Sequence, residues 1–312
     1  MQKQTGRSAC RGPIVRLDLR LMGKAANFRK LGIAAGSGPL PVAIAKAATD
    51  EGREVFIVGI EGAASADIEA FPHAWVRIGA LGEFLRLLKR EGCEDIVLIG
   101  GIKRPDLSKL GLDMTAMKIL PRLAGWMKEG DDGLLRGLSQ FLEKDHGFRL
   151  VGAHEIAASL LAPEGILTSV SPSPQDENDI DIAARAALAI GALDIGQGAI
   201  ACRGIVLALE AVEGTDAMLA RVAGLPNNIR GSETKRQGVL VKLSKPGQER
   251  RVDMPTIGVE TVERAAVAGL AGIAVEAGGT LIADIESVAR AANAKGLFVT
   301  GLSRKRFEQT NT

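Results

Sequence analysis

Residues 30–52 read KLGIAAGSGPLPVAIAKAATDEG. An apolar run leads into turn residues at 37–39, and apolar residues at helical spacing follow. This order predicts a strand, a glycine loop and a helix. Apolar runs at 55–60 and 96–99, with a helical pattern at 81–88 between them, continue the alternation. Strands that alternate with helices predict an α/β fold with a parallel sheet.

The rest of the chain has a different rhythm. Residues 106–145 predict helices, with Asp131 or Asp132 as an N-cap. The polar segment TSVSPSPQDEND predicts a linker, and helices mixed with strands are expected beyond it. We therefore divide the chain into a basic extension (1–29), a parallel-sheet domain (30–165), a linker (166–179) and a mixed α/β domain (180–304).

The composition excludes several classes of protein. Of the 312 residues, 46% are hydrophobic and 24% are charged, which suffices for a buried core and favours two domains. No run of about 18 apolar residues occurs, so we expect no membrane-spanning helix. Cys10, Cys93 and Cys202 lie far apart and lack the spacing of metal ligands. A reducing cytoplasm is therefore the expected location.

Charge is uneven along the chain. The first thirty residues carry a net charge of +7, and the remainder carries −5. A basic head attracts nucleic acid or anionic lipid, but a short charged terminus is more often a solvated tail. We expect the tail, and no nucleic-acid partner.

The loop at 36–41 has the composition of a nucleotide site. Glycines let a backbone approach a phosphate, and the N-terminus of the following helix favours an anion. The dinucleotide fingerprint GxGxxG is incomplete because Pro41 stands at the last glycine position. Three alternatives stay open: a nucleotide site, an NAD site with Glu61 on the ribose, and a tight structural turn.

A second loop, GGIKRP at 100–105, follows the predicted strand at 96–99. Ligands of open parallel sheets bind at the carboxyl ends of the strands. Lys103 and Arg104 are suited to neutralise a phosphate there. Solvated loop charges are an equal alternative.

Acidic and polar residues recur between 194 and 216. They are Asp194, Gln197, Glu210, Glu213, Thr215 and Asp216. Oxygen atoms at a strand end and in the first turn of a helix suit a hard cation. The alternative is helix capping by Thr215, with the acids favoured by the helix dipole.

The segment 242–258 places cations beside one carboxylate, Asp253. Such a set suits a polyphosphate centre, in which bases hold oxygens and an acid binds a metal or activates water. Composition alone favours a surface loop with an Arg–Asp ion pair. His73, His146 and His154 share no ligand spacing and are expected to be structural.

Several stretches, taken in order, resemble the LpxI family over nearly all of residues 30–300. They are KLGIAAGSGPLP, GDDGLL, LDIGQG, EGTDAML, KPGQERRVDMPTIG and AGLAGIAVEAGG. The resemblance implies a Rossmann-like N-terminal domain that binds UDP and a C-terminal mixed α/β domain that binds the acylated sugar phosphate. Ser37, where many relatives have glycine, and the basic head depart from the family pattern.

The resemblance also implies an activity. Members hydrolyse the pyrophosphate of UDP-2,3-diacylglucosamine to 2,3-diacylglucosamine 1-phosphate (lipid X) and UMP, in lipid A biosynthesis. Water attacks the α-phosphorus, Mg²⁺ is the expected cofactor, and a cytoplasmic homodimer is the expected state. Peripheral contact with the inner membrane, through the basic head, is a further hypothesis.

Carried onto this chain, the resemblance makes Asp253 the essential catalytic acid. Asp216 and Glu213 are expected as further catalytic residues, and Asp253 and Asp216 as Mg²⁺ ligands. Whether Asp253 binds the metal or takes a proton from water stays open. Charge and position add Lys245 and Arg251 as phosphate contacts. The full set expected to bind the nucleotide and substrate is Gly36, Ser37, Gly38, Leu40, Gly101, Lys103, Gln197, Thr215, Lys245, Arg251 and Thr256.

Two other classes compete with the hydrolase. An NAD-dependent oxidoreductase would use Glu61 and would not need Mg²⁺. A nucleotide-binding sensor would not turn substrate over. Neither class accounts for the acidic and basic residues of the second domain.

Overall fold

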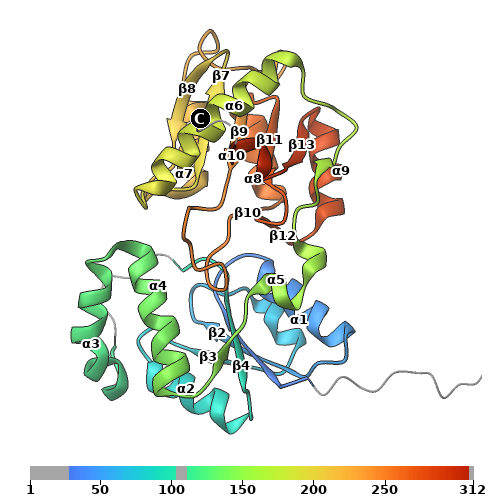
Figure 1. The fold of residues 1–312 in the computed structure, drawn as a ribbon. Helices are drawn as coiled ribbons and strands as arrows, with labels where there is room; N and C mark the ends of the chain where they lie inside the picture. The colour runs from blue at the N-terminus through green and yellow to red at the C-terminus, as the bar shows by residue number, and fades with distance from the viewer. Residues whose placement is uncertain (1–27, 103–110, 309–312) are drawn as a thin grey trace, which may run out of the picture.

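The computed structural model describes residues 28–102 and 111–308, which form two lobes (Figure 1). Lys103 and the basic head up to residue 27 lie outside the described residues. Each lobe contains its own sheet with helices packed against it. The predicted α/β class is confirmed. No helix in the described ranges is long and apolar enough to cross a membrane.

The N-terminal lobe contains a five-stranded sheet in the order β3-β2-β1-β4-β5. All its neighbouring strands are parallel, as the alternating pattern predicted. The strand order reverses between β1 and β4, and ligands of such sheets bind where it does. The strands are β1 (Leu31–Ala35), β2 (Val55–Ile60), β3 (His73–Val76), β4 (Asp95–Ile99) and β5 (Arg149–Leu150).

Helices flank this sheet, and apolar residues at helical spacing explain their packing. On α2, for example, Phe84, Leu85, Leu87 and Leu88 are all buried. The α4 helix begins at Gly130, so Asp131 and Asp132 lie inside its first turn and the predicted N-cap is wrong. The helices are α1 (Leu40–Asp50), η2 (Ala66–Ala70), α2 (Leu81–Arg90), α3 (Met114–Met127), α4 (Gly130–Gln140), the π-helical turn η4 (Phe141–Asp145), α5 (Ala153–Ile156) and η5 (Ala158–Leu160).

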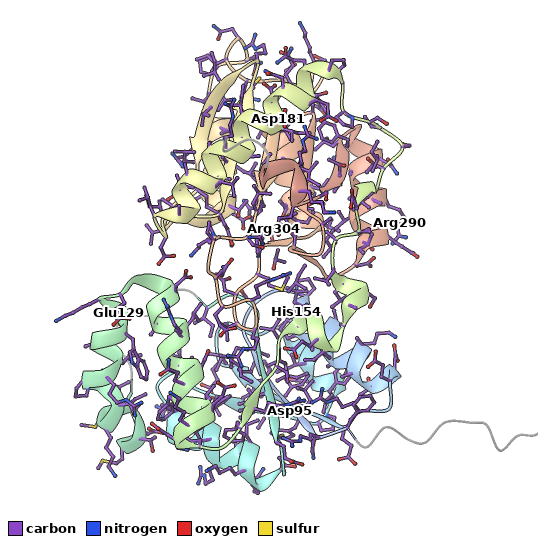
Figure 2. All side chains as sticks on the ribbon, viewed as in Figure 1. Asp95, Glu129, His154, Asp181, Arg290 and Arg304 are labelled. Atoms are coloured by element: carbon purple, nitrogen blue, oxygen red, sulfur yellow. The ribbon has the colours of Figure 1, made fainter. Side chains whose placement is uncertain are left out.

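A buried carboxylate ties three segments of this lobe together. Asp95 has no exposed surface and bonds Arg53 and Arg149. Although burial works in the opposite direction, the guanidinium groups of Arg149 and Arg53 hold the pKa of Asp95 below its usual value. Figure 2 places Asp95 far from the C-terminal lobe, so this cluster stabilises the fold rather than forming part of the site.

The C-terminal lobe contains a six-stranded mixed sheet in the order β6-β13-β11-β9-β7-β8. Its centre, β9, β11 and β13, is parallel, whereas β7 runs antiparallel to β9 and to β8. β7 and β8 form an antiparallel hairpin that turns at residues 203–204. The strands are β6 (Gly165–Ile166), β7 (Gly198–Cys202), β8 (Ile205–Leu209), β9 (Val239–Lys242), β11 (Gly272–Glu276) and β13 (Phe298–Leu302), with a separate pair of β10 (Thr256–Ile257) and β12 (Leu281–Ile282).

Both faces of this sheet are covered by helices. The longest, α6, is capped by Ser173 and Asp176, which bond each other's backbone amides, and it starts with Pro174. The described cysteines, Cys93 and Cys202, are buried free thiols. The helices are α6 (Pro174–Ala192), α7 (Gly214–Ala223), α8 (Val259–Val267), α9 (Ile285–Lys295) and α10 (Lys305–Glu308).

The chain passes between the lobes ahead of the predicted linker. Leu160 and Leu161 pack on the N-terminal core, and Ala162 already lies in the C-terminal core. Residues 166–179 belong to the C-terminal lobe, because β6 pairs with β13 and α6 starts at Pro174. Prolines and polar residues at 168–179 therefore accompany a helix cap and a surface turn.

The long loop between β9 and β10 bridges the two lobes (Figure 1). It leaves the carboxyl end of β9, and its Val252 and Met254 pack against hydrophobic residues of the N-terminal lobe. Arg251 of this loop lies against Gly152, just beyond β5. The carboxyl edges of the two sheets therefore face each other across this loop, which is where both lobes have their predicted site residues.

Candidate active site

The glycine loops after β1 and β4 pack directly against each other. The amide of Ser37 donates to the carbonyl oxygen of Gly101 at 2.8 Å, and the amide of Gly101 donates back at 3.2 Å. A Cβ on Gly36 would lie 2.6 Å from the carbonyl oxygens of Gly100 and Gly101, so a side chain there must displace the backbone. Ser37, Gly38 and Gly101 are exposed beside the point where the strand order reverses.

Leu40 differs from its predicted role. Its side chain is 5% exposed and packs in the core of the N-terminal lobe with Ile44. Pro39 precedes α1 and Pro41 lies in its first turn, so two of the positions that could offer an N–H group to an anion lack one. Only the backbone of Leu40 is left to meet a ligand.

Asp253 lies in the β9–β10 loop and is partly buried. Its Oδ2 accepts a hydrogen bond from the amide of Gln248, whose Oε1 accepts from the backbone of Lys245 at 3.0 Å. Burial raises the pKa of Asp253, against the charges of Lys245 and Lys242 and the bond from Gln248. Within the described chain no donor bonds Oδ1, which leaves that oxygen for a ligand or water.

Lys245 is 9% exposed and binds acids from both lobes. Its Nζ lies 2.6 Å from Oδ1 of Asp194 and 3.5 Å from Oδ1 of Asp132 on α4. Although burial disfavours its charge, Asp194, Asp132 and Asp253 together raise the pKa of Lys245. Asp194 has a φ of +53°, a strained conformation for a residue other than glycine. The positive charge of Lys245, which was predicted to contact a phosphate, is thus already balanced by carboxylates.

Arg251 joins the lobes. Its guanidinium lies 2.8 Å from Glu249 in its own loop and 2.7 Å from Glu143 of the N-terminal lobe. The bond with Glu249, together with that from Glu143, outweighs burial and raises the pKa of Arg251. Its charge is therefore also paired.

The two other predicted catalytic acids face the surface. Glu213 pairs with Arg221 at 2.6 Å, and Asp216 pairs with Arg264 at 3.4 Å. In the described ranges no contact links either acid to Asp253. Successive residues of a helix point about 100° apart, so α7 directs Thr215 inward and its neighbour Asp216 towards α8. The structure does not bring Asp216 and Asp253 together as a pair of metal ligands.

Thr215 and Thr256 meet at Lys242. The ammonium of Lys242 donates to Oγ1 of Thr215 at 2.8 Å and to the carbonyl oxygen of Thr256 at 3.0 Å. The hydroxyl of Thr215 donates in turn to Oε1 of Glu210 at 2.6 Å. Oε2 of Glu210 and Oε1 of Gln197 are buried without a partner among the described residues. Buried polar atoms of this kind are uncommon and mark candidate functional positions.

Sequence reasoning missed the partners of the site's charged residues. Asp132 and Asp194 flank Lys245, and Gln248 holds Asp253. All three occur in the stretches GDDGLL, LDIGQG and KPGQERRVDMPTIG. The sequence suggested Asp194 as a cation ligand and Asp132 as an N-cap, but it did not pair either acid with Lys245. The excess of acids in GDDGLL and LDIGQG is the signal that could have pointed to Asp132 and Asp194.

A magnesium site would depend on Asp253. Within the described ranges, no three His, Cys, Asp or Glu residues gather in a group able to hold a metal. Mg²⁺ is usually held by one or two carboxylates together with substrate phosphates and waters. The free Oδ1 of Asp253 fits that kind of site, whereas Asp216 is engaged by Arg264.

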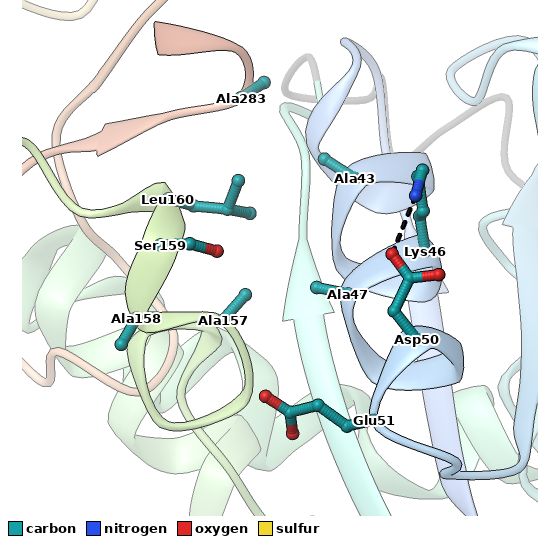
Figure 3. A pocket seen from close by; sticks show the side chains of 10 residues that line it. All are labelled: Ala43, Lys46, Ala47, Asp50, Glu51, Ala157, Ala158, Ser159, Leu160 and Ala283. Atoms are coloured by element: carbon teal, nitrogen blue, oxygen red, sulfur yellow. Dashed lines mark hydrogen bonds and ion pairs between the residues drawn. The ribbon is translucent and has the colours of Figure 1, made fainter. Parts of the chain in front are cut away.

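A pocket of about 440 Å³ lies elsewhere, between α1 and the crossing segment 157–160 (Figure 3). The exposed ion pair of Lys46 and Asp50, at 2.7 Å, stands at its wall. No predicted site residue of the described chain lines it. The position of Asp253, Lys245 and their partners is the better guide to the site, because charged groups converge there.

His154 lies on α5 where the lobes meet, and Arg304 lies on the facing side of the other lobe (Figure 2). The Nδ1 atom of His154 is buried without a hydrogen-bond partner in the described structure. Burial lowers the pKa of His154, and the charge of Arg250 acts in the same direction. That His154 is structural stays a prediction.

Two solved structures align distantly with the chain. CobK precorrin-6A reductase aligns with a TM-score of 0.31 and 14% identity, over 89% of this chain and 88% of its own. A glycinamide-RNase-transformylase T from Mycobacterium tuberculosis aligns with a TM-score of 0.22 and 15% identity, over 59% of this chain and 44% of its own. Likenesses this weak carry no inference about function.

Sequence relationships are much closer. The model of the LpxI N-terminal domain matches residues 30–160, and that of the LpxI C-terminal domain matches residues 163–300. The boundary between them coincides with the crossing between the lobes. A Caulobacter vibrioides protein named UDP-2,3-diacylglucosamine pyrophosphatase LpxI is 48% identical over 275 residues, which cover 88% of this chain and 98% of the relative. On this agreement along both lobes, the chain belongs to the LpxI family.

Proposed function

We propose that this protein hydrolyses the pyrophosphate bond of UDP-2,3-diacylglucosamine to UMP and 2,3-diacylglucosamine 1-phosphate (lipid X), in lipid A biosynthesis. The name of the Caulobacter vibrioides relative supports the substrate and the reaction class. The observation that carries the proposal is Asp253, a partly buried carboxylate between the lobes that is oriented by Gln248 and flanked by lysines.

Asp253 would act on the water that attacks the α-phosphorus. The water oxygen forms a bond to that phosphorus, and the bond from the phosphorus to the bridging oxygen breaks. The uridine side leaves as UMP, and the bridging oxygen stays with the phosphate of the sugar. Burial raises the pKa of Asp253, which makes its carboxylate a stronger base than an exposed one.

The glycine loops are the proposed nucleotide site. Ser37, Gly38 and Gly101 expose backbone at the carboxyl edge of the parallel sheet, where nucleotides bind in related architectures. The β9–β10 loop bears Asp253 and meets the same edge of this lobe. A nucleotide held by one lobe would thereby reach an acid supplied by the other, and the two glycine loops would orient it.

Mg²⁺ is the proposed cofactor, with Asp253 as its protein ligand. When bound, it would draw charge from the phosphate oxygens. Lys245 holds positive charge beside Asp253 in any case, and Gln248 fixes the carboxylate. Proton acceptor and metal ligand are both roles that require the same ionised oxygen, so removal of the carboxylate is expected to abolish activity either way.

The test is release of UMP from UDP-2,3-diacylglucosamine, with and without Mg²⁺. We expect metal-dependent release by the wild type and a loss of at least about 100-fold in Asp253→Ala, the scale of a lost acid–base group. Asp50→Ala, which removes an exposed carboxylate of α1, is the matched control. A folded wild type that releases no UMP would overturn the assignment and leave a nucleotide-binding sensor as the better hypothesis.

The homodimer is also proposed, and the edge strand β8 supports it. Ile205 is 65% exposed, and Val206 and Leu209 are each 38% exposed. Exposed apolar residues on an edge strand favour pairing with another chain. Light scattering on the wild type and on Ile205→Lys tests this, and a monomeric wild type would contradict it.

A cytoplasmic location with peripheral membrane contact completes the proposal. The substrate is a lipid, and the net charge of +7 over the first thirty residues would attract an anionic surface. Deletion of residues 1–21 should weaken sedimentation with anionic vesicles and leave sedimentation with neutral vesicles unchanged. Equal sedimentation of both proteins with anionic vesicles would count against this contact.

A further inference from the structure

Lys242 is the last residue of β9, at the carboxyl edge of the C-terminal sheet. It is 5% exposed, and its Nζ bonds the hydroxyl of Thr215 at 2.8 Å and the carbonyl oxygen of Thr256 at 3.0 Å. Thr256 is the first residue of β10 and lies three residues beyond Asp253, which is in the bridging loop. The bond from Lys242 to Thr256 therefore places the ammonium at the end of the segment that bears Asp253.

Glu210 lies behind Lys242 and reaches it only through Thr215. Its Oε1 accepts the hydroxyl of Thr215 at 2.6 Å, and its Oε2 is buried without a partner among the described residues. A Cβ on Gly196 would lie 2.2 Å from the carbonyl oxygen of Glu210, and one on Gly198 would lie 2.6 Å from Oε2. The two glycines of the IGQG stretch therefore make room for this glutamate.

The two lysines of the edge differ in how their charge is compensated. Lys245 has the carboxylates of Asp194 and Asp132 within 2.6 Å and 3.5 Å. Lys242 has a hydroxyl and a carbonyl group as its partners, and no carboxylate of the described chain forms an ion pair with it. An ammonium has three donor protons, and two are used here. Lys242 is thus the better placed of the two to accept an anion.

A purely structural role explains this cluster poorly. Burying a lysine and a glutamate is costly unless they pair closely. The chain through the hydroxyl of Thr215 leaves one carboxylate oxygen of Glu210 unbonded, and a buried acceptor without a partner destabilises the fold. Buried groups held in such an arrangement are expected where a ligand supplies the missing partner.

We propose that Lys242 binds the pyrophosphate of the substrate beside Asp253, and that Glu210 is its positioning residue, acting through the hydroxyl of Thr215. The inference rests on the proposed function for the identity of the anion. It replaces Lys245 as the main phosphate contact. Lys245 instead joins the lobes and balances the acids around Asp253.

The test is binding of UDP, measured by calorimetry on the full chain without turnover. Loss of a hydrogen-bonded charge on a phosphate should weaken binding about 10- to 100-fold in Lys242→Met. Lys295→Met, at the exposed end of α9, should bind as the wild type does. Uridine has no phosphate, so its affinity for Lys242→Met should differ less than twofold from its affinity for the wild type.

Three further variants separate binding from folding. Lys242→Met leaves Glu210 as an uncompensated buried charge, so Lys242→Met/Glu210→Gln should regain thermal stability and still bind UDP weakly. Thr215→Val preserves the shape of the side chain but breaks the chain from Glu210 to Lys242, and it should weaken UDP binding several-fold. Thr215→Ser retains the hydroxyl and should restore most of the affinity.

The outcomes distinguish this inference from the proposed function. If the wild type and Lys242→Met/Glu210→Gln bind UDP equally while the wild type releases UMP, the role of Lys242 is overturned and the hydrolase stands. If the wild type neither binds UDP nor releases UMP, the proposed function fails and this inference fails with it. If Thr215→Ser binds no better than Thr215→Val, Glu210 has no positioning role.

Discussion

The side-chain amide of Gln248 donates a hydrogen bond to Oδ2 of Asp253, five residues further along the same loop. The other end of that amide accepts the backbone N–H of Lys245 at 3.0 Å. Gln248 therefore fixes the carboxylate to the backbone at the start of the bridging loop. The orientation of Asp253 depends on this loop as well as on the lobes that it contacts.

Replacing Gln248 should change the pH dependence of activity. The bond from Gln248 favours the ionised form of Asp253, so Gln248→Ala should raise the pKa of that carboxyl further. The acid limb of kcat against pH should move to higher pH, and kcat at neutral pH should fall about 10-fold, as for a lost hydrogen bond to a charged group. Gln175→Ala, which removes a surface amide on α6, is the matched control. An unmoved acid limb would contradict the role of Gln248.

Asp253→Asn should remove activity without loss of stability. Burial raises the pKa of Asp253 in the folded protein, so the folded state binds this proton more tightly than the unfolded state. Above the unfolded pKa of about 3.9, ionising this carboxyl therefore costs stability. The amide should melt at the same temperature as the wild type, or higher, at pH 7, and this gain should disappear near pH 3. A lower melting temperature at pH 7 would show that the carboxylate stabilises the fold.

Asp95→Asn should destabilise the N-terminal lobe. The amide leaves the buried Arg53 without its charged partner, which costs about 3–5 kcal/mol. Since the pKa of Asp95 is held low, its contribution is present above the unfolded pKa of about 3.9 and is lost as the pH falls through the folded value. The difference in free energy of unfolding between Asp95→Asn and the wild type should therefore become smaller in acid.

Fluorescence can follow this lobe selectively, because Trp75 and Trp126 are the chain's two tryptophans and both lie in it. Urea titrations of Asp95→Asn at pH 7 and in acid measure the effect. A gap that stays constant with pH would contradict the charged pairing. Asp67→Asn, at an exposed cap of η2, is a control with little expected change.

Gly36→Ala should destabilise the contact of the glycine loops. Its Cβ would lie 2.6 Å from two backbone carbonyl oxygens, and forced repacking of this kind costs about 1–3 kcal/mol. UDP binding should weaken with it. Gly125→Ala meets nothing within 4 Å and lies inside α3, so it should stabilise by about 0.5–1 kcal/mol. The fluorescence titration compares both, and equal midpoints for the two variants would refute the steric argument.

The elements of the first lobe could be predicted because their signals are local. Strand β1, the glycine loop and α1 follow the periodicity of residues 30–52. The linker at 166–179 was expected from composition, but its prolines serve the start of α6 and its first residue pairs in β6. Proline and polar residues mark helix caps and turns as well as linkers, so composition could not separate the two.

The site was predictable in part. Asp253 accepts a hydrogen bond from Gln248, and Thr215 lies between Glu210 and Lys242, so both have polar or charged neighbours. Their roles in the site stay predictions. Asp216 follows Thr215 in the chain but faces α8, since neighbouring helix positions point in different directions. Leu40 was assigned to the nucleotide from its place in the loop, although its apolar side chain is better buried in the core.

Long-range pairing explains what was missed. Asp132 is 113 residues from Lys245 in sequence, and Asp194 is 51 residues away. No periodicity or spacing rule connects positions so far apart, since only the folded arrangement brings the lobes together. The excess of acids in GDDGLL and LDIGQG indicated that a positively charged partner was needed. It could not show that this partner would be Lys245, which lies in another motif.

The bridging loop also has a genetic consequence. Val252 and Met254, the two sequence neighbours of Asp253, pack in the hydrophobic core of the opposite lobe. A substitution in that packing, far from any reacting atom, should therefore appear in a screen as an enzyme with slow turnover rather than as an unfolded protein. Second-site suppressors of such alleles should map across the boundary, to residues 243–255, and pairs of alleles of this kind would trace the contact without a structure.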